Sequence, residues 1–182
     1  MTMRVRIPQT AVARRERFER IYRSNYEAIL GYARRRTEPD EAADVLAETF
    51  LVAWRRLEAV PEGDETRPWL YGTARRVVAN HERARRRRGR LDARLREAPG
   101  AAAAPAGDRA ALAAAFLRLT EQEREVLSLV GWEGLDAKQV GAVLGCSANA
   151  ARIRLHRARR RLAGELERAG WSMNSHPLEE IA

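Results

Sequence analysis

The chain has 182 residues, of which 45% are hydrophobic and 32% charged, and its formal net charge is +9. This length suits one medium domain or two small ones, and the high charge leaves little room for one large core. The basic excess predicts a polyanionic partner, because phosphates neutralised by arginine release condensed counterions. Nucleic acid is favoured over a membrane surface, and the alternative is a solvated basic surface.

Several classes of protein are excluded by what the sequence lacks. The single cysteine, Cys146, cannot form an internal disulfide framework, which fits a cytoplasmic protein. There is no apolar core of a signal peptide and no run of the roughly 20 apolar residues that a membrane span needs, so we expect no membrane insertion. His81, His156 and His176 have no metal-ligand spacing, so we expect no metal and no cofactor. Without a phosphate loop, a nucleophile elbow or a convergent acid pair, we expect no enzyme.

The N-terminal segment, residues 1–15, is basic and contains Pro8, which predicts a flexible arm. Helical periodicity begins near Phe18 and continues until Glu38-Pro39-Asp40 interrupts it. Apolar residues three and four positions apart predict one buried face. This face contains Phe18, Ile21, Tyr22, Tyr26, Ile29, Leu30 and Ala33.

A second helix is expected over about residues 41–57, with Asp40 as its N-cap. Its acidic residues stand out in a basic protein. They are either solvent-facing groups that stabilise the helix or part of a protein-docking face. Its apolar side is expected to contain Ala43, Leu46, Ala47, Phe50, Leu51 and Trp54.

A third helix follows the polar segment at 58–67, with Pro68 in its first turn. It begins with aromatic residues and ends in a dense run of arginines between Arg83 and Arg90. Aromatic side chains beside arginines suit single strands or distorted duplex, through stacking and phosphate contact. Alternatively, Trp69 and Tyr71 belong to the core and the arginines form a solvated tail.

Residues 98–107, with two prolines, two glycines and several alanines, predict a flexible linker. The helical pattern resumes beyond it. Thr120 and Glu123 have the spacing of a capping box that starts a helix. No alternating strand pattern occurs. We therefore expect an all-α fold of two small helical domains, the second a four-helix domain with a helix-turn-helix.

The helix-turn-helix is predicted over residues 136–162, as a short helix, a glycine-containing turn and a longer basic helix. Ser147 can cap the second helix. Ala151, Leu155, Ala158 and Leu162 are spaced to pack inward, so Asn149, Arg152, Ile153 and His156 should point away from the core. Such a helix can enter a DNA groove, while the alternative is an ordinary basic amphipathic helix.

In this order the motifs resemble those of the extracytoplasmic-function group of bacterial sigma factors, which carry only the second and fourth conserved sigma regions. The resemblance implies a region 2 over residues 16–97, a region 4 over 108–170 and a C-terminal tail at 171–182. It is carried by residues 18–36 (FERIYRSNYEAILGYARRR), 40–57 (DEAADVLAETFLVAWRRL), 67–88 (RPWLYGTARRVVANHERARRRR) and 119–162.

The resemblance implies a sigma factor that binds core RNA polymerase and directs transcription initiation at promoters with −10 and −35 elements. The polymerase contact would be the clamp helices of the largest subunit, and an anti-sigma factor is a further partner that the family permits. The loop at about 59–67 would help hold an unstacked base. The family motifs imply polymerase-binding residues Asp44, Leu46, Glu48 and Phe50; −10 DNA-binding residues Arg75, Arg76, Asn80, Arg83, Arg86 and Arg87; and −35 DNA-binding residues Ser147, Asn149, Arg152, Arg154, His156 and Arg157.

The sequence departs from the family pattern at four positions. Ala43 and Ala47 stand where the family commonly has Glu and Gln in the polymerase-binding helix. Arg76 and Asn80 stand where it often has Asn and Asp, which makes the DNA-facing helix more positive. A polymerase-independent helix-turn-helix regulator is the alternative function, and it would need no acidic docking helix.

Overall fold

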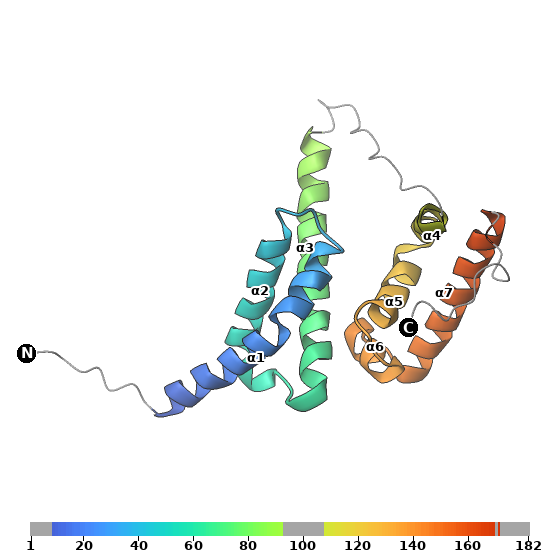
Figure 1. The fold of residues 1–182 in the computed structure, drawn as a ribbon. Coiled ribbons are helices and arrows are strands. Elements are labelled where there is room, and N and C mark those ends of the chain that lie inside the picture. Colours follow the sequence, from blue (N-terminus) through green and yellow to red (C-terminus); the bar gives the residue numbers. More distant parts are fainter. Residues whose placement is uncertain (1–8, 93–107, 170, 172–182) are drawn as a thin grey trace, which may run out of the picture. The chain divides into compact units, whose positions relative to one another are not determined.

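The computed structural model describes residues 9–92, 108–169 and 171, which divide into two compact units on either side of the Arg96–Glu97 junction (Figure 1). Every regular element within these ranges is a helix. The predicted all-α fold in two units is therefore confirmed. The expected linker at 98–107 and tail residues 172–182 lie outside the described residues.

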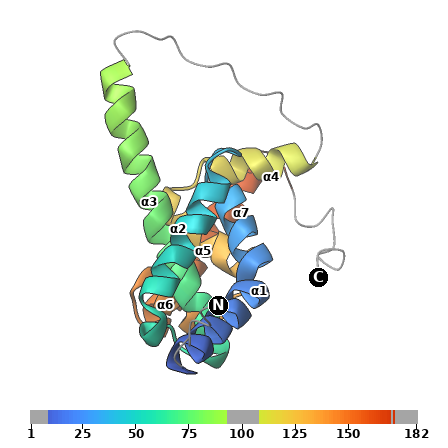
Figure 2. The same cartoon turned by 90° about the vertical axis from the view of Figure 1, so that its left-hand side faces the viewer.

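The first unit consists of α1 (Gln9–Arg34), α2 (Ala42–Arg55) and α3 (Thr66–Asp92), which all pack against one another. Two short 3-10 turns, η1 (Leu57–Ala59) and η2 (Gly63–Glu65), connect α2 to α3. Ile29, Tyr32, Val45, Leu57 and Leu70 are almost fully buried in its core. Burial of each such aliphatic side chain contributes about 1.5–3 kcal/mol. The C-terminal part of α3 projects beyond α1 and α2 (Figure 2), so its surface is accessible on most sides.

The start of α1 differs from the expected N-terminal arm. The helix begins at Gln9, directly after Pro8, so residues 9–15 are helical. One physical reason is a long-range contact: Nη2 of Arg14 donates a 2.7 Å hydrogen bond to the carbonyl oxygen of Trp54 at the end of α2. Such a contact joins positions forty residues apart and leaves no periodic trace in the sequence.

The buried face of α2 is also different from the expected one. Glu41 and not Asp40 occupies the N-cap, with no side-chain capping hydrogen bond. Thr49 is fully buried because its hydroxyl donates to the carbonyl oxygen of Val45 at 2.7 Å, which satisfies the polar group inside the helix. The side of α2 that faces the core is therefore rotated about the helix axis relative to the predicted side. Its buried residues are Ala42, Val45, Leu46, Thr49, Phe50 and Ala53, whereas Ala43, Ala47, Leu51 and Trp54 are exposed.

The apolar face predicted for α1 is buried only in its C-terminal half, at Ile29, Leu30 and Ala33. Its N-terminal half joins an aromatic cluster with α2, in which Phe18 lies 5.2 Å from Trp54 and Tyr22 lies 4.7 Å from Phe50, measured between ring centroids. These separations suit edge-to-face and offset packing. Tyr22 and Trp54 each keep 37% of their surface exposed, so the cluster reaches the molecular surface.

The second unit consists of α4 (Asp108–Leu117), α5 (Glu121–Gly131), α6 (Ala137–Leu144) and α7 (Ala148–Arg168), as the four-helix prediction required. The capping box of Thr120 and Glu123 is present, and Asp136 forms a second one with Gln139. Gly145 ends α6 with a positive φ of 68°, a conformation that favours glycine. Val126, Leu129, Val140, Ala151 and Ala158 are buried in this core.

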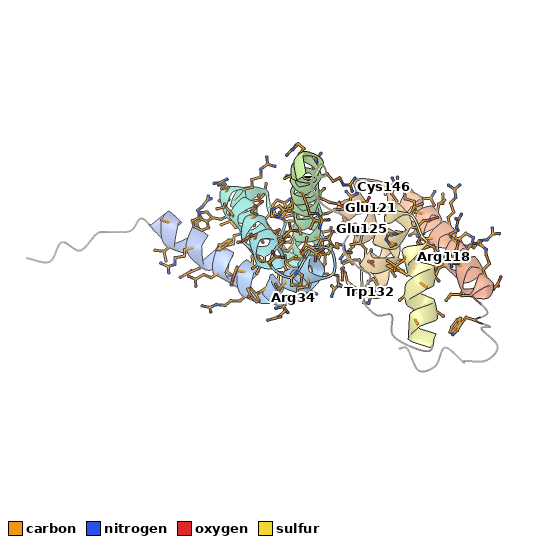
Figure 3. All side chains as sticks on the ribbon, turned by 90° about the horizontal axis from the view of Figure 1, so that it is seen from above. Arg34, Arg118, Glu121, Glu125, Trp132 and Cys146 are labelled. Carbon is orange, nitrogen blue, oxygen red and sulfur yellow. The ribbon has the colours of Figure 1, made fainter. Side chains whose placement is uncertain are left out.

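A buried carboxylate, Glu165, joins the last turns of α7 to α4. Its side chain is 3% exposed and accepts a 2.6 Å hydrogen bond from Arg168 and a 3.3 Å one from Arg161. Arg118, which directly follows α4 and is labelled in Figure 3, lies 3.7 Å from the same carboxylate. The hydrogen bond from Arg168 is the largest influence on the pKa of Glu165 and, helped by the charge of Arg161, holds it below its ordinary value of 4.5 although burial opposes this.

Replacing Gly141 by alanine should destabilise the second unit. A Cβ at this position would lie 2.6 Å from the carbonyl oxygen of Cys146, and backbone atoms cannot move aside as a side chain can. We expect the free energy of unfolding to fall by about 1–3 kcal/mol in urea denaturation followed by circular dichroism. Gly164→Ala is the matched control, because that Cβ meets only the end of the Arg168 side chain at 3.8 Å. The control should be neutral or raise stability by up to about 1 kcal/mol; equal losses in both variants would contradict the packing argument.

The stabilising effect of Glu165 should depend on pH. Because its folded-state pKa is lowered, the contribution is fully present above the unfolded value near 4.5 and disappears as pH falls through the folded value. We expect Glu165→Gln to lower the melting temperature at pH 7, and the difference from the unsubstituted protein to shrink below pH 4.5. Glu167→Gln, at an exposed neighbouring position on α7, should show no such convergence. A difference for Glu165→Gln that stayed constant down to pH 3 would contradict the assignment.

Candidate nucleic-acid and protein interfaces

The helix-turn-helix is built by a close approach of α6 and α7. Gly141 lies against the backbone of the turn, and its carbonyl oxygen accepts a 2.9 Å hydrogen bond from the amide of Cys146. Cys146, labelled in Figure 3, is a half-exposed free thiol in this turn. The first turn of α7 is capped by Ser147, whose hydroxyl oxygen accepts from the amide of Ala150 at 3.1 Å. The short turn therefore holds α7 at a defined angle to α6.

The inward side of α7 determines which residues point out. Ala151 and Ala158 are buried, and Leu155 and Leu162 are half-buried, as predicted. With 3.6 residues per turn, the opposite side presents an exposed reading face. The reading face consists of Asn149, Arg152, Ile153, His156 and Arg157, all of which are exposed.

The chemistry of the reading face suits base edges in a major groove. Asn149 and Arg152 can pair bidentately with adenine and guanine, and the exposed Ile153 can contact a thymine methyl group. Arg154 is also exposed but lies further round the helix, toward the core side, where it is better placed for a phosphate. The oxygen of Ser147 is used in capping, which leaves its hydroxyl hydrogen for a phosphate contact.

A second basic surface lies on α3. We call it the arginine face, and its residues fall on one side of the helix at spacings of three, four and seven. It combines a projecting helix end with exposed guanidinium groups, one of which, on Arg83, donates to the side-chain oxygen of Asn80. All the residues expected there are exposed: Arg75, Arg76, Asn80, Arg83, Arg86 and Arg87.

The aromatic start of α3 is divided between two roles. Tyr71 is 3% exposed and lies 5.3 Å from Tyr32, between ring centroids, so it belongs to the core. Trp69 is half-buried. The arginines further along the helix are exposed, as either a nucleic-acid contact or a solvated surface would require. Of the two aromatic residues considered from the sequence, only Trp69 is accessible enough for a stacking contact.

The residues expected to bind polymerase separate into two groups on α2. Leu46 is 7% exposed and Phe50 is 3% exposed, so both support the helix from inside the unit and cannot form its outer surface. Asp44 and Glu48 are exposed. The exposed docking stripe therefore consists of Asp44, Ala47, Glu48 and Leu51, of which the sequence analysis placed Ala47 and Leu51 on the inner side.

Leu51 is the residue that sequence reasoning missed on this surface. It is 43% exposed, which is unusual for a leucine on a helix with an apolar face of its own. The pattern that could have shown this consists of Ala42, Val45, Thr49 and Ala53, which lie three and four positions apart and are all buried. Their burial places Leu51 on the opposite, outer side of the helix. It was overlooked because a threonine was not counted as a core residue.

A hydrogen bond connects the docking stripe to α3, the helix that carries the arginine face. Nε2 of His81 on α3 lies 2.9 Å from Oε1 of Glu48 on α2. His81 is the better shielded partner, with 20% of its side chain exposed against 52% for Glu48. One carboxylate oxygen of Glu48 is therefore already hydrogen-bonded to another residue of the first unit.

Other kinds of site are not evident in the parts of the chain that are described. The histidine, cysteine and acidic side chains of residues 9–92, 108–169 and 171 form no group that could hold a metal ion. Within the same residues, none of the helices has the length and apolar character needed to span a membrane.

Comparisons with known proteins identify both units. Residues 21–88 match the family described as Sigma-70 region 2, and residues 109–162 match Sigma-70, region 4. The ECF RNA polymerase sigma factor SigL of Mycobacterium tuberculosis is 28% identical over 174 residues, 91% of this chain and 97% of the relative. The RNA polymerase sigma-E factor of Streptomyces coelicolor is 32% identical over 155 residues, 82% of this chain and 85% of the relative.

A solved structure has the same fold. It is the sigma factor RpoE of Bartonella quintana in complex with the anti-sigma factor NepR, with a TM-score of 0.65 and 23% identity, covering 82% of this chain and 96% of that one. The two family matches follow the order of the two units, and the relatives extend over nearly the whole chain. The chain therefore belongs to the ECF group of RNA polymerase sigma factors.

Proposed function

We propose that this sigma factor divides its work between three surfaces: the docking stripe binds core RNA polymerase, the arginine face acts at the −10 element, and the reading face of α7 binds the −35 element. As a sigma factor the chain directs transcription initiation and has RNA polymerase as its partner. The observation that carries the division is the separation of charge: an acidic stripe with an exposed leucine on α2, and basic faces on α3 and α7.

The reading face would lie in the major groove of duplex DNA. The helix-turn-helix aims the first turns of α7 outward, which is where this motif contacts base edges. Asn149 and Arg152 supply hydrogen-bonding groups for bases, while Ser147, Arg154 and Arg157 supply phosphate contacts. His156 lies one turn beyond Arg152 on the same face.

The arginine face would follow the backbone of promoter DNA that is being opened. Its five arginines would neutralise phosphates, and Asn80 can pair with a base edge. The loop that leads into α3, at residues 59–67, would hold a base extruded from the stack. Extrusion costs a few kcal/mol, which contacts in a pocket must offset.

The docking stripe suits the clamp helices of the largest polymerase subunit because it combines carboxylates with apolar area. Leu51 supplies the apolar contact, and Asp44 and Glu48 would pair with basic side chains. Ala43 and Ala47 replace larger polar residues common in the family, so the contact depends more on Asp44 and Leu51. An acidic surface of this kind is not needed by a polymerase-independent regulator, and the comparisons give no support for that alternative.

Two further properties follow from this function. We infer that the chain has no enzymatic activity of its own, since each surface described would act by binding. We also infer a cytoplasmic location, where RNA polymerase and DNA are found. A nuclease assay on single- and double-stranded DNA would test the first inference.

The proposed function can be tested by transcription in vitro with core polymerase from the same host. The promoter is identified from transcripts that appear on overexpression. We expect promoter-dependent run-off product with the unsubstituted chain, and no such product would contradict the function.

Asp44→Asn combined with Leu51→Ala should weaken core binding by about 1–3 kcal/mol, since both groups lie on the exposed stripe. Glu48 is left unchanged because its substitution would also disturb the bond to His81.

Glu27→Gln, an exposed acid on α1, is the control for the docking variant and should leave core binding unchanged. Binding of duplex −35 DNA by the second unit should also be unaffected by Asp44→Asn with Leu51→Ala. Normal core affinity in the double variant would place the polymerase contact elsewhere.

Arg152 and Arg154 should differ in the kind of binding they support. We expect Arg152→Ala to weaken holoenzyme binding at the −35 element by about 1–3 kcal/mol and to relax the base preference at one position. Arg154→Ala, which removes the same charge two residues along α7, should weaken binding to all −35 sequences alike. Gel-shift titrations of promoters with single −35 substitutions would measure both effects. A changed base preference with Arg154→Ala alone would reverse the two assignments.

A further inference from the structure

The connection between α2 and α3 is held from outside by two arginines of α1. Arg14 donates from Nη2 to the carbonyl oxygen of Trp54 at 2.7 Å, and its guanidinium group lies 5.1 Å from the centre of the Trp54 ring. Arg17 donates from Nη1 to the carbonyl oxygen of Leu57 at 3.1 Å and from Nη2 to that of Val60 at 2.8 Å. The carbonyl groups of Trp54 and Val60 lie in the last turn of α2 and directly after the η1 turn, and that of Leu57 also accepts a 3.2 Å hydrogen bond from the amide of Val60.

Arg17 is the better placed of the two to fix the connection. Only 23% of its side chain is exposed, and it also lies 3.8 Å from Glu58 and 3.6 Å from Glu62. Its planar guanidinium group binds two carbonyl oxygens, three residues apart in the chain, through two separate nitrogens, whereas a lysine would have to reach both from a single nitrogen. Val60, whose carbonyl it binds, is 2% exposed, so the anchored point is rigidly packed.

The far end of the connection is anchored to the same helix. Nε of Arg67 donates to Oδ1 of Asn25 on α1 at 3.3 Å, and Asn25 is held by its own bond to the carbonyl oxygen of Ile21 at 2.8 Å. Inside these anchors, the hydroxyl of Thr66 donates to the carbonyl oxygen of Pro61 at 2.7 Å. The segment left between them, residues 61–65, is an arch whose tip at Glu62, Gly63 and Asp64 is exposed.

We propose that Arg17 is a positioning residue for promoter opening: it holds the arch in the shape that receives the extruded base. This inference rests on the proposed function of the 59–67 loop. A loop already ordered at both ends loses less conformational entropy on binding than a free one. The arginine therefore acts through the arch and touches no base itself.

The test uses holoenzyme and fork-junction DNA that carries the −10 element with an unpaired non-template strand. One fork is intact, and others each lack one base of that strand. Unsubstituted holoenzyme should bind the fork that lacks the extruded base more weakly than the intact fork. Arg17→Ala should weaken binding of the intact fork by about tenfold, as expected for two lost hydrogen bonds, and should no longer distinguish the two forks.

Arg23→Ala is the matched control, because it removes the same charge from α1 at a residue that pairs with Glu19 of its own helix at 3.6 Å. The control should keep the discrimination between forks. Arg17→Lys, which retains the charge but has a single donor group, should have an intermediate effect and carries the test if the melting temperature of Arg17→Ala is strongly reduced. Equal weakening of both forks by the Arg17 variants would show a merely structural role and overturn the proposal.

If the proposed role of the 59–67 loop in holding a base is wrong, the experiment gives a different result. If unsubstituted holoenzyme bound all forks equally, the loop would not hold a base, and both the proposed role of the loop and this inference would be wrong. If the unsubstituted protein discriminated and Arg17→Ala discriminated equally well, only the role of Arg17 would be wrong.

Discussion

Both α2 and α7 bury only one side, and this constraint determines which of their residues can face a partner. In α7 the alanines Ala151 and Ala158 occupy the buried side, so Asn149 and Arg152 must face solvent. In α2 the buried Val45 and Thr49 turn Asp44 and Leu51 outward in the same way. The functional residues are thus oriented by small core residues on the opposite side of their own helix.

The distribution of charge over these outer surfaces has a physical consequence for partner choice. A chain with net charge +9 is attracted to DNA wherever its arginines are exposed. The docking stripe is an exception, because its carboxylates repel phosphates and leave its apolar area available for a protein. Two kinds of partner can then bind the same small unit without competing for one face. The bond between His81 and Glu48 keeps the helices that carry these faces in register.

Elements that depend on local chemistry could be predicted from the sequence. The capping box at Thr120, the cap at Ser147 and the outward direction of Asn149 and Arg152 each follow from residues within one helix or turn. The buried side of α2 could not be predicted in this way, because a threonine that bonds to its own backbone packs like an apolar residue. Leu46 and Phe50, which the family motif implied as polymerase-binding residues, are core residues, in agreement with their expected place on the apolar side of the helix.

The helical start of α1 is a second feature that could not be predicted from the sequence, and it bears on function. Residues 9–15 have few apolar partners, so periodicity gave no reason to extend the helix before Phe18. In the structure this part of α1 is helical, and Arg14 and Arg17 bind carbonyl groups forty or more residues away, at the end of α2 and in the turn that follows it. The segment that the sequence suggests is a basic arm therefore has a structural role, because it binds the connection between α2 and α3. Its arginines hold the connection that leads into α3 through hydrogen bonds to its backbone.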